Sequence, residues 1–221
     1  MEQSTVDGML AWQSGVRLAA VAEKLRARGF EAEVCDTREA ARERVVALAR
    51  EAKSVGFGGS LSVACLNLTR ELREAGKEIL NHGFPNLTFE EKMEIMRRQL
   101  TCDLFLSSIN ALTDEGVIVN VDGNGNRVAS TIFGPRRVVF VVGRNKVVTG
   151  GVHAALERVR AVAGPVNAHR LGKKTPCAVT GACADCAGSC PESICRVVTI
   201  IRQRPSCTPT TVLLVNEDLG L

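Results

Sequence analysis

The amino-acid sequence predicts an α/β protein with a mainly parallel sheet flanked by helices. Segments of helical periodicity alternate with short apolar runs along most of the chain, which is typical of parallel sheets with helices on both faces. The run 138–142 is apolar throughout, as expected of a strand that is buried on both sides. Residues 1–221 are expected to form one domain, because this length suffices for a single full core.

The first half of the chain is expected to supply three helices and two strands. Gly29 ends the first helix, and Thr37 can cap the second. In order, the expected elements are a helix from about Val6 to Arg28, a strand Glu31–Cys35, a helix from Thr37 to about Ala52, a short strand from Ser54 that enters a glycine turn, and a helix to about Ala75.

The second half begins with a capping box, because Thr88 and Glu91 have the spacing of that motif, and a helix should follow to about Leu100. Strands are expected at 103–106, 117–122, 138–142, 197–202 and 211–216. Consecutive strands between 117 and 142 suggest a local antiparallel hairpin, with a turn at 123–126. A helix capped by Thr149 should run to about Ala163, where Gly164 and Pro165 end it.

The composition argues against nucleic-acid binding and against a membrane span. Aromatic residues make up only 4%, and acidic residues are interleaved with basic ones, so that the net charge of +4 forms no basic stripe. No apolar run is long enough to cross a bilayer, and the N-terminus lacks the pattern of a signal peptide. We therefore expect a cytoplasmic protein, in which clustered cysteines more often bind metal than form disulfides.

Five of the nine cysteines lie between Cys177 and Cys195, in a Gly-rich excursion at 172–196 that contains little to pack in a core. Cys183 and Cys186 form a C-x2-C knuckle, whose spacing lets both thiolates reach one metal centre. Cys177 and Cys195 flank the knuckle and can complete a set of four, with Cys190 as the alternative fourth ligand. The segment is expected to be an irregular loop that is ordered by its metal.

The identity of the metal stays open between zinc and iron–sulfur, since four thiolates suit either. The uneven spacing of the cysteines is less typical of structural zinc, and 183–191 matches the end of the bacterial ferredoxin pattern, so [4Fe–4S] is favoured. A patch of reduced thiols or a single disulfide is the alternative. Three further cysteines are expected to be small buried apolar residues, namely Cys35, Cys65 and Cys102.

Two polar segments follow predicted strands. Gly58, Gly59 and Ser60 form a glycine turn that opens a helix, a place suited to an anion, although a tight turn that needs only small residues is the alternative. In the second segment, residues 110–127, Asp114 or Glu115 can act as a base or nucleophile, and Arg127 can hold a carboxylate or phosphate. A hairpin whose Asn and Gly residues supply positive φ is the alternative there. The expected ligand residues are Gly58, Gly59, Ser60, Asn110, Asp122, Asn126 and Arg127, and the ligand is a small anion.

Several stretches together resemble the LUD (lactate-utilisation) domain family, which includes lactate-utilisation protein C. The most specific is Asp122-Gly-x-Gly-Asn-Arg127 with the following Phe-Gly-Pro. A subgroup is similar in carrying Thr-Pro-Cys, Thr-Gly-x-Cys-x-Asp-Cys and Ile-Cys, which fit Cys177, Cys183, Cys186 and Cys195. The interval before Cys195 is longer here. Other matching stretches are 55–60, 103–127, 141–146 and 215–220.

The resemblance implies a fold like those of ribose-5-phosphate isomerase and the CoA transferases, in which a glycine loop and an acidic residue form the active site. It also implies a role in lactate or related organic-acid oxidation, beside redox partner proteins that carry iron–sulfur centres. One alternative is a free-standing enzyme acting on a sugar phosphate or CoA ester. The other is a non-catalytic binding protein with a structural zinc.

Overall fold

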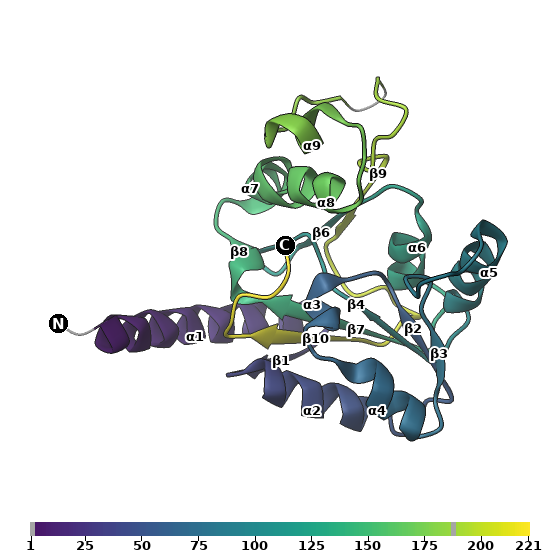
Figure 1. Ribbon diagram of the computed structural model, residues 1–221. Coiled ribbons are helices and arrows are strands. Elements are labelled where there is room, and N and C mark those ends of the chain that lie inside the picture. The colour runs from purple at the N-terminus through teal and green to yellow at the C-terminus, as the bar shows by residue number, and fades with distance from the viewer. Residues whose placement is uncertain (1–2, 187–188) are drawn as a thin grey trace.

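The computed structural model describes residues 3–186 and 189–221. Its larger sheet has six strands, all parallel, in the order β1-β10-β7-β4-β2-β3 (Figure 1). The α/β fold with a mainly parallel sheet is therefore confirmed. The strands are β1 (Glu31–Cys35), β2 (Ser54–Phe57), β3 (Glu78–Leu80), β4 (Leu104–Ser107), β7 (Arg137–Gly143) and β10 (Thr210–Val215).

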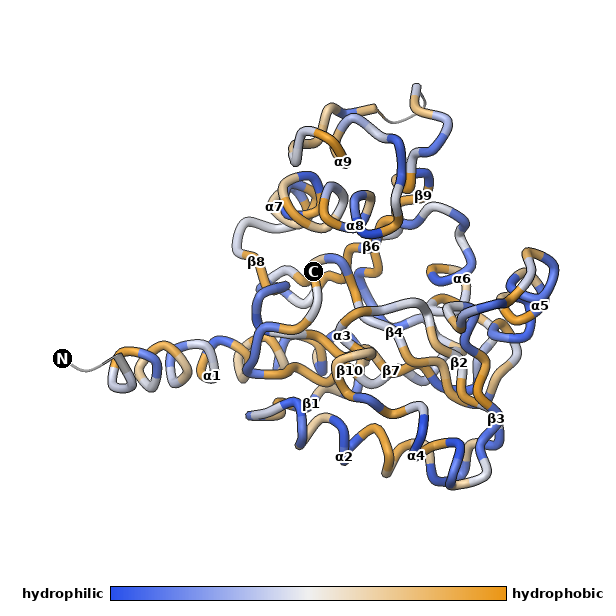
Figure 2. The backbone as a smooth tube through the Cα atoms, viewed as in Figure 1, coloured by the Kyte–Doolittle hydropathy of each residue, from blue (hydrophilic) through white to orange (hydrophobic). Residues whose placement is uncertain are grey.

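Both faces of this sheet are buried, because side chains alternate along each strand. In β7, Val139 and Val141 pack with one core cluster, whereas Val138, Phe140 and Val142 pack with another. The apolar colour gathers along these strands (Figure 2). The first cluster includes three helices, α2 (Arg38–Leu48), α3 (Leu61–Ala64) and α4 (Leu68–Glu74). The second includes α1 (Gln3–Ala27), whose N-terminal half projects from the body (Figure 1).

A second sheet has four strands in the order β8-β5-β6-β9. They are β5 (Ala111–Thr113), β6 (Ile118–Asp122), β8 (Val147–Val148) and β9 (Val197–Ile201). The hairpin expected between 117 and 142 is wrong, since β6 pairs with β5 and β9 and never with β7. The reason is α6 (Asn126–Ile132), a helix in place of a simple turn, which returns the chain from the smaller sheet to the larger one.

The helix expected to end at Gly164 continues instead to Arg170. It consists of α7 (Gly151–Arg158), a π-helical segment at Val159–Ala163, and α8 (Gly164–Arg170). Pro165 is tolerated because it stands in the first turn of α8, where its missing N–H is not needed. Thr149 is not the cap, since Gly150 occupies the N-cap position with φ 110°.

Other elements follow the sequence with local changes. The helix expected to reach Ala75 is split into α3 and α4 at Asn67, which has φ 50°. Thr88 and Glu91 form the expected capping box before α5 (Phe89–Gln99). The Cys-rich segment carries a short helix, α9 (Pro176–Thr180), where no regular structure was expected. Ala187 and Gly188 of that excursion lie outside the described residues. No helix in the described part of the chain is both long and apolar enough for a bilayer span.

Candidate functional site

The candidate site lies at the carboxyl ends of the central strands. Gly58 and Gly59 follow β2, Ser108 follows β4, and Arg144–Lys146 follow β7. Because β7, β4 and β2 are neighbours in the parallel sheet, these ends meet at one edge, where α/β proteins bind ligands. The second polar segment reaches the same edge from the smaller sheet, through Asn110 and the turn after β6.

The glycine turn after β2 requires its glycines. A Cβ on Gly58 would lie 2.9 Å from Ser107 Oγ and 3.2 Å from Arg127 Cγ, too close for any side chain. Gly59 has φ 70°, a left-handed conformation that glycine adopts without strain. Ser60 is the N-cap of α3, and its Oγ accepts from the N–H of Val63 at 3.3 Å. The turn thus packs directly against the second polar segment.

Arg127 joins the two sheets as a buried clamp. Its Nε lies 3.2 Å from Asp122 Oδ2, and both side chains are buried, at 15% and 8% exposure. The remaining N–H groups donate at 2.8 to 3.2 Å to oxygen atoms of Ser108, Asn110, Asn120 and Val121. All five donors of the guanidinium are therefore engaged, so Arg127 positions other groups and has no donors left for a ligand carboxylate.

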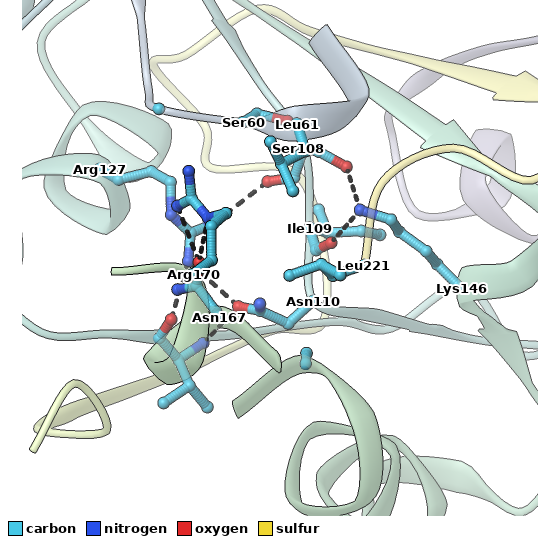
Figure 3. A pocket seen from close by; sticks show the side chains of 13 residues that line it. Ser60, Leu61, Ser108, Ile109, Asn110, Arg127, Lys146, Asn167, Arg170 and Leu221 are labelled. Atoms are coloured by element: carbon cyan, nitrogen blue, oxygen red, sulfur yellow. Dashed lines mark hydrogen bonds between the residues drawn. The ribbon is translucent and has the colours of Figure 1, made fainter. Parts of the chain in front are cut away.

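A cavity of about 90 Å³, the Lys146 cavity, lies between these segments (Figure 3). Lys146 is 4% exposed, and its Nζ donates to Ser108 Oγ at 3.0 Å and to Ile109 O at 3.2 Å. Burial, followed by the charges of Arg158 and Arg127, lowers the pKa of Lys146 to about 7. The cavity is lined by Gly59, Ser60, Leu61, Ser108, Ile109, Asn110, Val121, Arg127, Lys146, Ala163, Asn167, Arg170 and Leu221.

A larger cavity of about 480 Å³, the His82 cavity, shares Gly59, Asn110 and Arg127 with the first. His82 Nδ1 lies 3.1 Å from Gln99 Nε2, an amide nitrogen that cannot accept a hydrogen bond. The ring proton of neutral His82 is therefore assigned to Nε2, which faces the glycine turn. Burial lowers the pKa of His82, which favours that neutral form. Gly58, Asp122 and Asn126 also line this cavity.

The structure thus brings together every expected ligand residue, but it places Asp114 elsewhere. Asp114 lies in the turn that follows β5, and it lines neither cavity. Asn110 precedes the same strand, so the length of β5 separates Asp114 from the site. Sequence reasoning missed Ser108, Lys146 and His82. Each directly follows a strand or lies within three residues of its end. Applying the strand-end rule to every predicted strand would have identified Ser108 and Lys146, whereas β3, which precedes His82, was not predicted.

Four of the clustered cysteines line a third cavity, the cysteine cavity, of about 230 Å³. They are Cys177, Cys183, Cys186 and Cys195, and apolar side chains of Val121, Leu156, Val159, Pro165 and Val198 complete most of the wall. Cys190 is not among the lining residues. Within residues 3–186 and 189–221, no three Cys, His, Asp or Glu side chains meet closely enough to hold a single metal ion.

The sulfur atoms already have polar neighbours. Thr175 Oγ1 lies 3.3 Å from Cys177 Sγ, and the N–H of Asp185 donates to Cys183 Sγ at 3.4 Å. Burial, followed by the neighbouring cysteines, raises the pKa of the Cys186 and Cys195 thiols. Four thiolates in this cavity would therefore repel one another unless a cationic group neutralised them.

The remaining cysteines divide differently from the prediction. Cys35 and Cys102 are buried, as expected, and burial raises the pKa of each thiol to about 11. Cys65 is exposed, which corrects the expectation that it is buried. It follows α3, where the short helix ends and its side chain faces outward. Cys207 is exposed as well.

Comparison with known proteins identifies the family. A crystal structure of a DUF162 family protein from Deinococcus radiodurans is similar in fold, with a TM-score of 0.54 and 15% sequence identity over 91% of this chain and 98% of that one. No curated protein matches the chain. The family model of the LUD domain matches residues 18–215, which include both sheets, the two polar segments and the cysteine cavity. The chain therefore belongs to the LUD domain family.

Proposed function

We propose that this protein acts in the oxidation of lactate or a related organic acid, as a component that carries a metal centre on Cys177, Cys183, Cys186 and Cys195. The observation that carries the proposal is the cysteine cavity, in which four cysteines from separate turns of one segment surround an apolar space. Bound there, an iron–sulfur cluster would supply one-electron transfer to and from redox partner proteins.

The shape of the cavity favours a cluster over a single zinc ion. Zinc–sulfur bonds of about 2.3 Å require the four sulfur atoms to converge on one point. In the described residues no three ligands converge in this way, whereas a cavity of about 230 Å³ lies among the four cysteines. Cys190 remains only the alternative fourth ligand, because it does not line the cavity. [4Fe–4S] is therefore the favoured centre, and structural zinc is the alternative.

The metal centre would adjoin the ligand site. Val121, Val159, Gly164 and Cys195 line both the cysteine cavity and the His82 cavity, so one layer of residues separates the two. Gly164 permits this contact, since a Cβ there would lie 3.8 Å from Cys195 Sγ and 3.0 Å from Val159 O. A small organic anion in the His82 cavity would lie beside the centre that exchanges electrons.

A second candidate function is turnover of a sugar phosphate or CoA ester. The size of the His82 cavity and the cations on its rim, Lys92, Arg170 and Lys173, favour a phosphorylated ligand. The placement of Asp114 weakens this candidate, because the acid that the resemblance assigns to such chemistry does not line the cavity. If Asp114→Asn still turns over these substrates, the second candidate function stands and Asp114 has no catalytic role in it.

The test of the metal centre is anaerobic purification followed by iron, sulfide and zinc analysis and by electron paramagnetic resonance of the reduced protein. We expect about four iron and four sulfide per chain, lost in Cys186→Ser. Cys207→Ser is the matched control, since Cys207 is exposed and lies outside the segment. Stoichiometric zinc without sulfide would replace the redox role with a structural one. Protein that binds neither metal, with all thiols free, would overturn the proposal.

The biological role is tested in the organism of origin. Deletion of the gene is expected to slow growth on lactate as the carbon source, and the wild-type and Cys207→Ser genes should restore it. The Cys186→Ser gene should fail to do so. Normal growth of the deletion strain on lactate would contradict a role in lactate oxidation, whether or not the protein binds a metal.

A further inference from the structure

Lys146 is a buried cation without an acidic partner. Its Nζ is bonded to a hydroxyl and a carbonyl oxygen, and no described Asp or Glu side chain forms an ion pair with it. The charges of Arg158 and Arg127 also disfavour a proton on Lys146, whereas Cys65 acts in the opposite direction. A buried, unpaired ammonium is costly, so the geometry is suited to a neutral amine or to an amine that meets an anion.

The surroundings of Lys146 favour a small carboxylic acid. Among the described residues that line the Lys146 cavity there is no Asp or Glu side chain. The α-carboxylate of Leu221, which also lines the cavity, forms no ion pair with Lys146 or Arg170, and Arg170 supplies a free cationic edge. Arg170 donates to Asn167 Oδ1 through Nε and Nη2, and its Nη1 donates to no group in the described part of the chain. A volume of about 90 Å³ corresponds to roughly three water molecules at about 30 Å³ each, so the cavity admits only a small acid.

From these contacts we propose that the Lys146 cavity binds a small 2-oxo acid and that Lys146 forms an imine with its carbonyl carbon. Arg170 binds the carboxylate, and the Lys146 amine faces the adjacent carbonyl group. The proposal rests on the small organic anion of the proposed function, and it places that anion in the Lys146 cavity, which shares Asn167 and Arg170 with the His82 cavity. It is independent of the metal centre.

The chemistry balances without an outside oxidant or reductant. The Nζ lone pair attacks the carbonyl carbon, and a carbinolamine forms after one proton moves from nitrogen to oxygen. Loss of that oxygen as water leaves a C=N bond between Nζ and the former carbonyl carbon. Ser108 Oγ, 3.0 Å from Nζ, is placed to carry the proton between nitrogen and the departing oxygen.

The lowered pKa makes Lys146 distinguishable from the other lysines. At about pH 7, an ordinary lysine is neutral in fewer than roughly one molecule in a thousand, whereas an amine with a pKa near 7 is neutral in about half. Lys146 should therefore react first with a carbonyl compound near neutral pH.

The experiment treats the wild-type protein with glyoxylate or pyruvate and sodium borohydride at about pH 7, where Lys146 is selectively neutral. The hydride reduces the imine to a stable secondary amine, and peptide mass spectrometry locates it. We expect one adduct per chain, at Lys146. Lys146→Arg should abolish it while keeping a positive charge, and Lys53→Met, at an exposed lysine outside the cavity, should not change it.

If the variants fold poorly, the position of the adduct in the wild-type protein decides the outcome by itself. Adducts spread over exposed lysines, or none at Lys146, overturn the proposal. Oxalate, which carries carboxylates and no ketone, distinguishes anion binding from imine formation in a thermal-shift assay. Stabilisation by oxalate without an adduct keeps the anion site and removes the imine, whereas absence of both removes the site as well.

Discussion

Arg127 and Lys146 show how single residues define this site. All five N–H donors of Arg127 interact with protein acceptors, which fixes the turn after β6 against Ser108 and Asn110. Lys146 uses only part of its hydrogen-bonding capacity and lines a cavity. The two cations therefore have different roles: the first holds the walls in place, and the second is available to a ligand.

Arg127→Met is expected to destabilise the fold by about 3–5 kcal/mol, because Asp122 would be left as a buried charge without its partner. Urea denaturation measures the change. Arg136→Met is the control: Arg136 is 84% exposed beside Asp103, and its loss should cost less than about 1 kcal/mol. Equal effects of the two substitutions would contradict the clamp.

The stability of the protein should depend on pH through Lys146. Its pKa falls from 10.5 to about 7 on folding, mainly by burial and then by Arg158 and Arg127, while Cys65 acts in the opposite direction. Between these values the unfolded chain binds a proton that the folded chain lacks, so this group makes stability rise with pH. Lys146→Met removes that dependence.

Relative to wild type, the free energy of unfolding of Lys146→Met should therefore be most favourable below pH 7. This relative stability should decrease as the pH approaches 10, by about 1.4 kcal/mol for each unit by which folding lowers the pKa of Lys146. Denaturation curves of both proteins across this range give the difference at each pH. A difference that stays constant would show that Lys146 is protonated normally in the folded protein.

Helix ends in this protein are set by different residues at different places. Before α5, Thr88 Oγ1 accepts from the N–H of Glu91, and Glu91 Oε2 accepts from the N–H of Thr88. Before α7, the predicted cap Thr149 gives way to Gly150, and the helix passes Gly164 through a π-helical segment. That segment contributes Val159 and Ala163 to the His82 cavity, so the irregular turn lies at the site itself.

These two helix starts supply a matched pair of substitutions. Thr88→Ala should cost about 1 kcal/mol, because the N–H of Glu91 loses the Thr88 Oγ1 that accepts its hydrogen bond. Thr149→Ala should change the free energy of unfolding by less than about 0.5 kcal/mol, since Gly150 is the N-cap. Thermal or urea unfolding of both variants provides the comparison, and a larger effect at Thr149 would contradict the observed start of α7.

At the scale of the whole molecule, the two sheets have different relations to the cysteines. The larger sheet is enclosed by α1 on one side and by α2, α3 and α4 on the other. The cysteine cavity lies beyond the smaller sheet, where α7, α8 and α9 gather (Figure 1). The strands of the larger sheet contribute nothing to its wall.

Loss of the proposed metal centre should therefore loosen one part of the protein and spare the other. In Cys183→Ser, amide hydrogen exchange should accelerate in α9 and around Cys195, while β7 and β10 remain protected. Cys207→Ser should leave both regions unchanged. Equal loss of protection throughout the larger sheet would show that the metal centre supports the entire fold.

The sequence by itself determined those features that depend only on residues close together in the chain. The continuous apolar run of β7, the box of Thr88 and Glu91, and the spacing of Cys183 and Cys186 depend on residues within a few positions of one another. They predicted the parallel sheet and the starts of α2, α3 and α5, and the binding of one metal by four cysteines stays a prediction. They failed at Gly164 and at the turn after β6, where packing against the rest of the chain overrode local preference.

Only the tertiary structure decided which of these residues meet. Gly59 and Lys146 follow strands that are far apart in the sequence, and the strand order β7-β4-β2 brings them to one edge, which Arg127 reaches from the smaller sheet. The same topology places Asp114 at the other end of β5, engages every donor of Arg127, and buries Lys146. No local pattern encodes strand order, because it depends on how distant segments share one core. Part of the candidate site could therefore be predicted from the sequence, whereas Ser108, Lys146 and His82, and the separate role of each residue, could not.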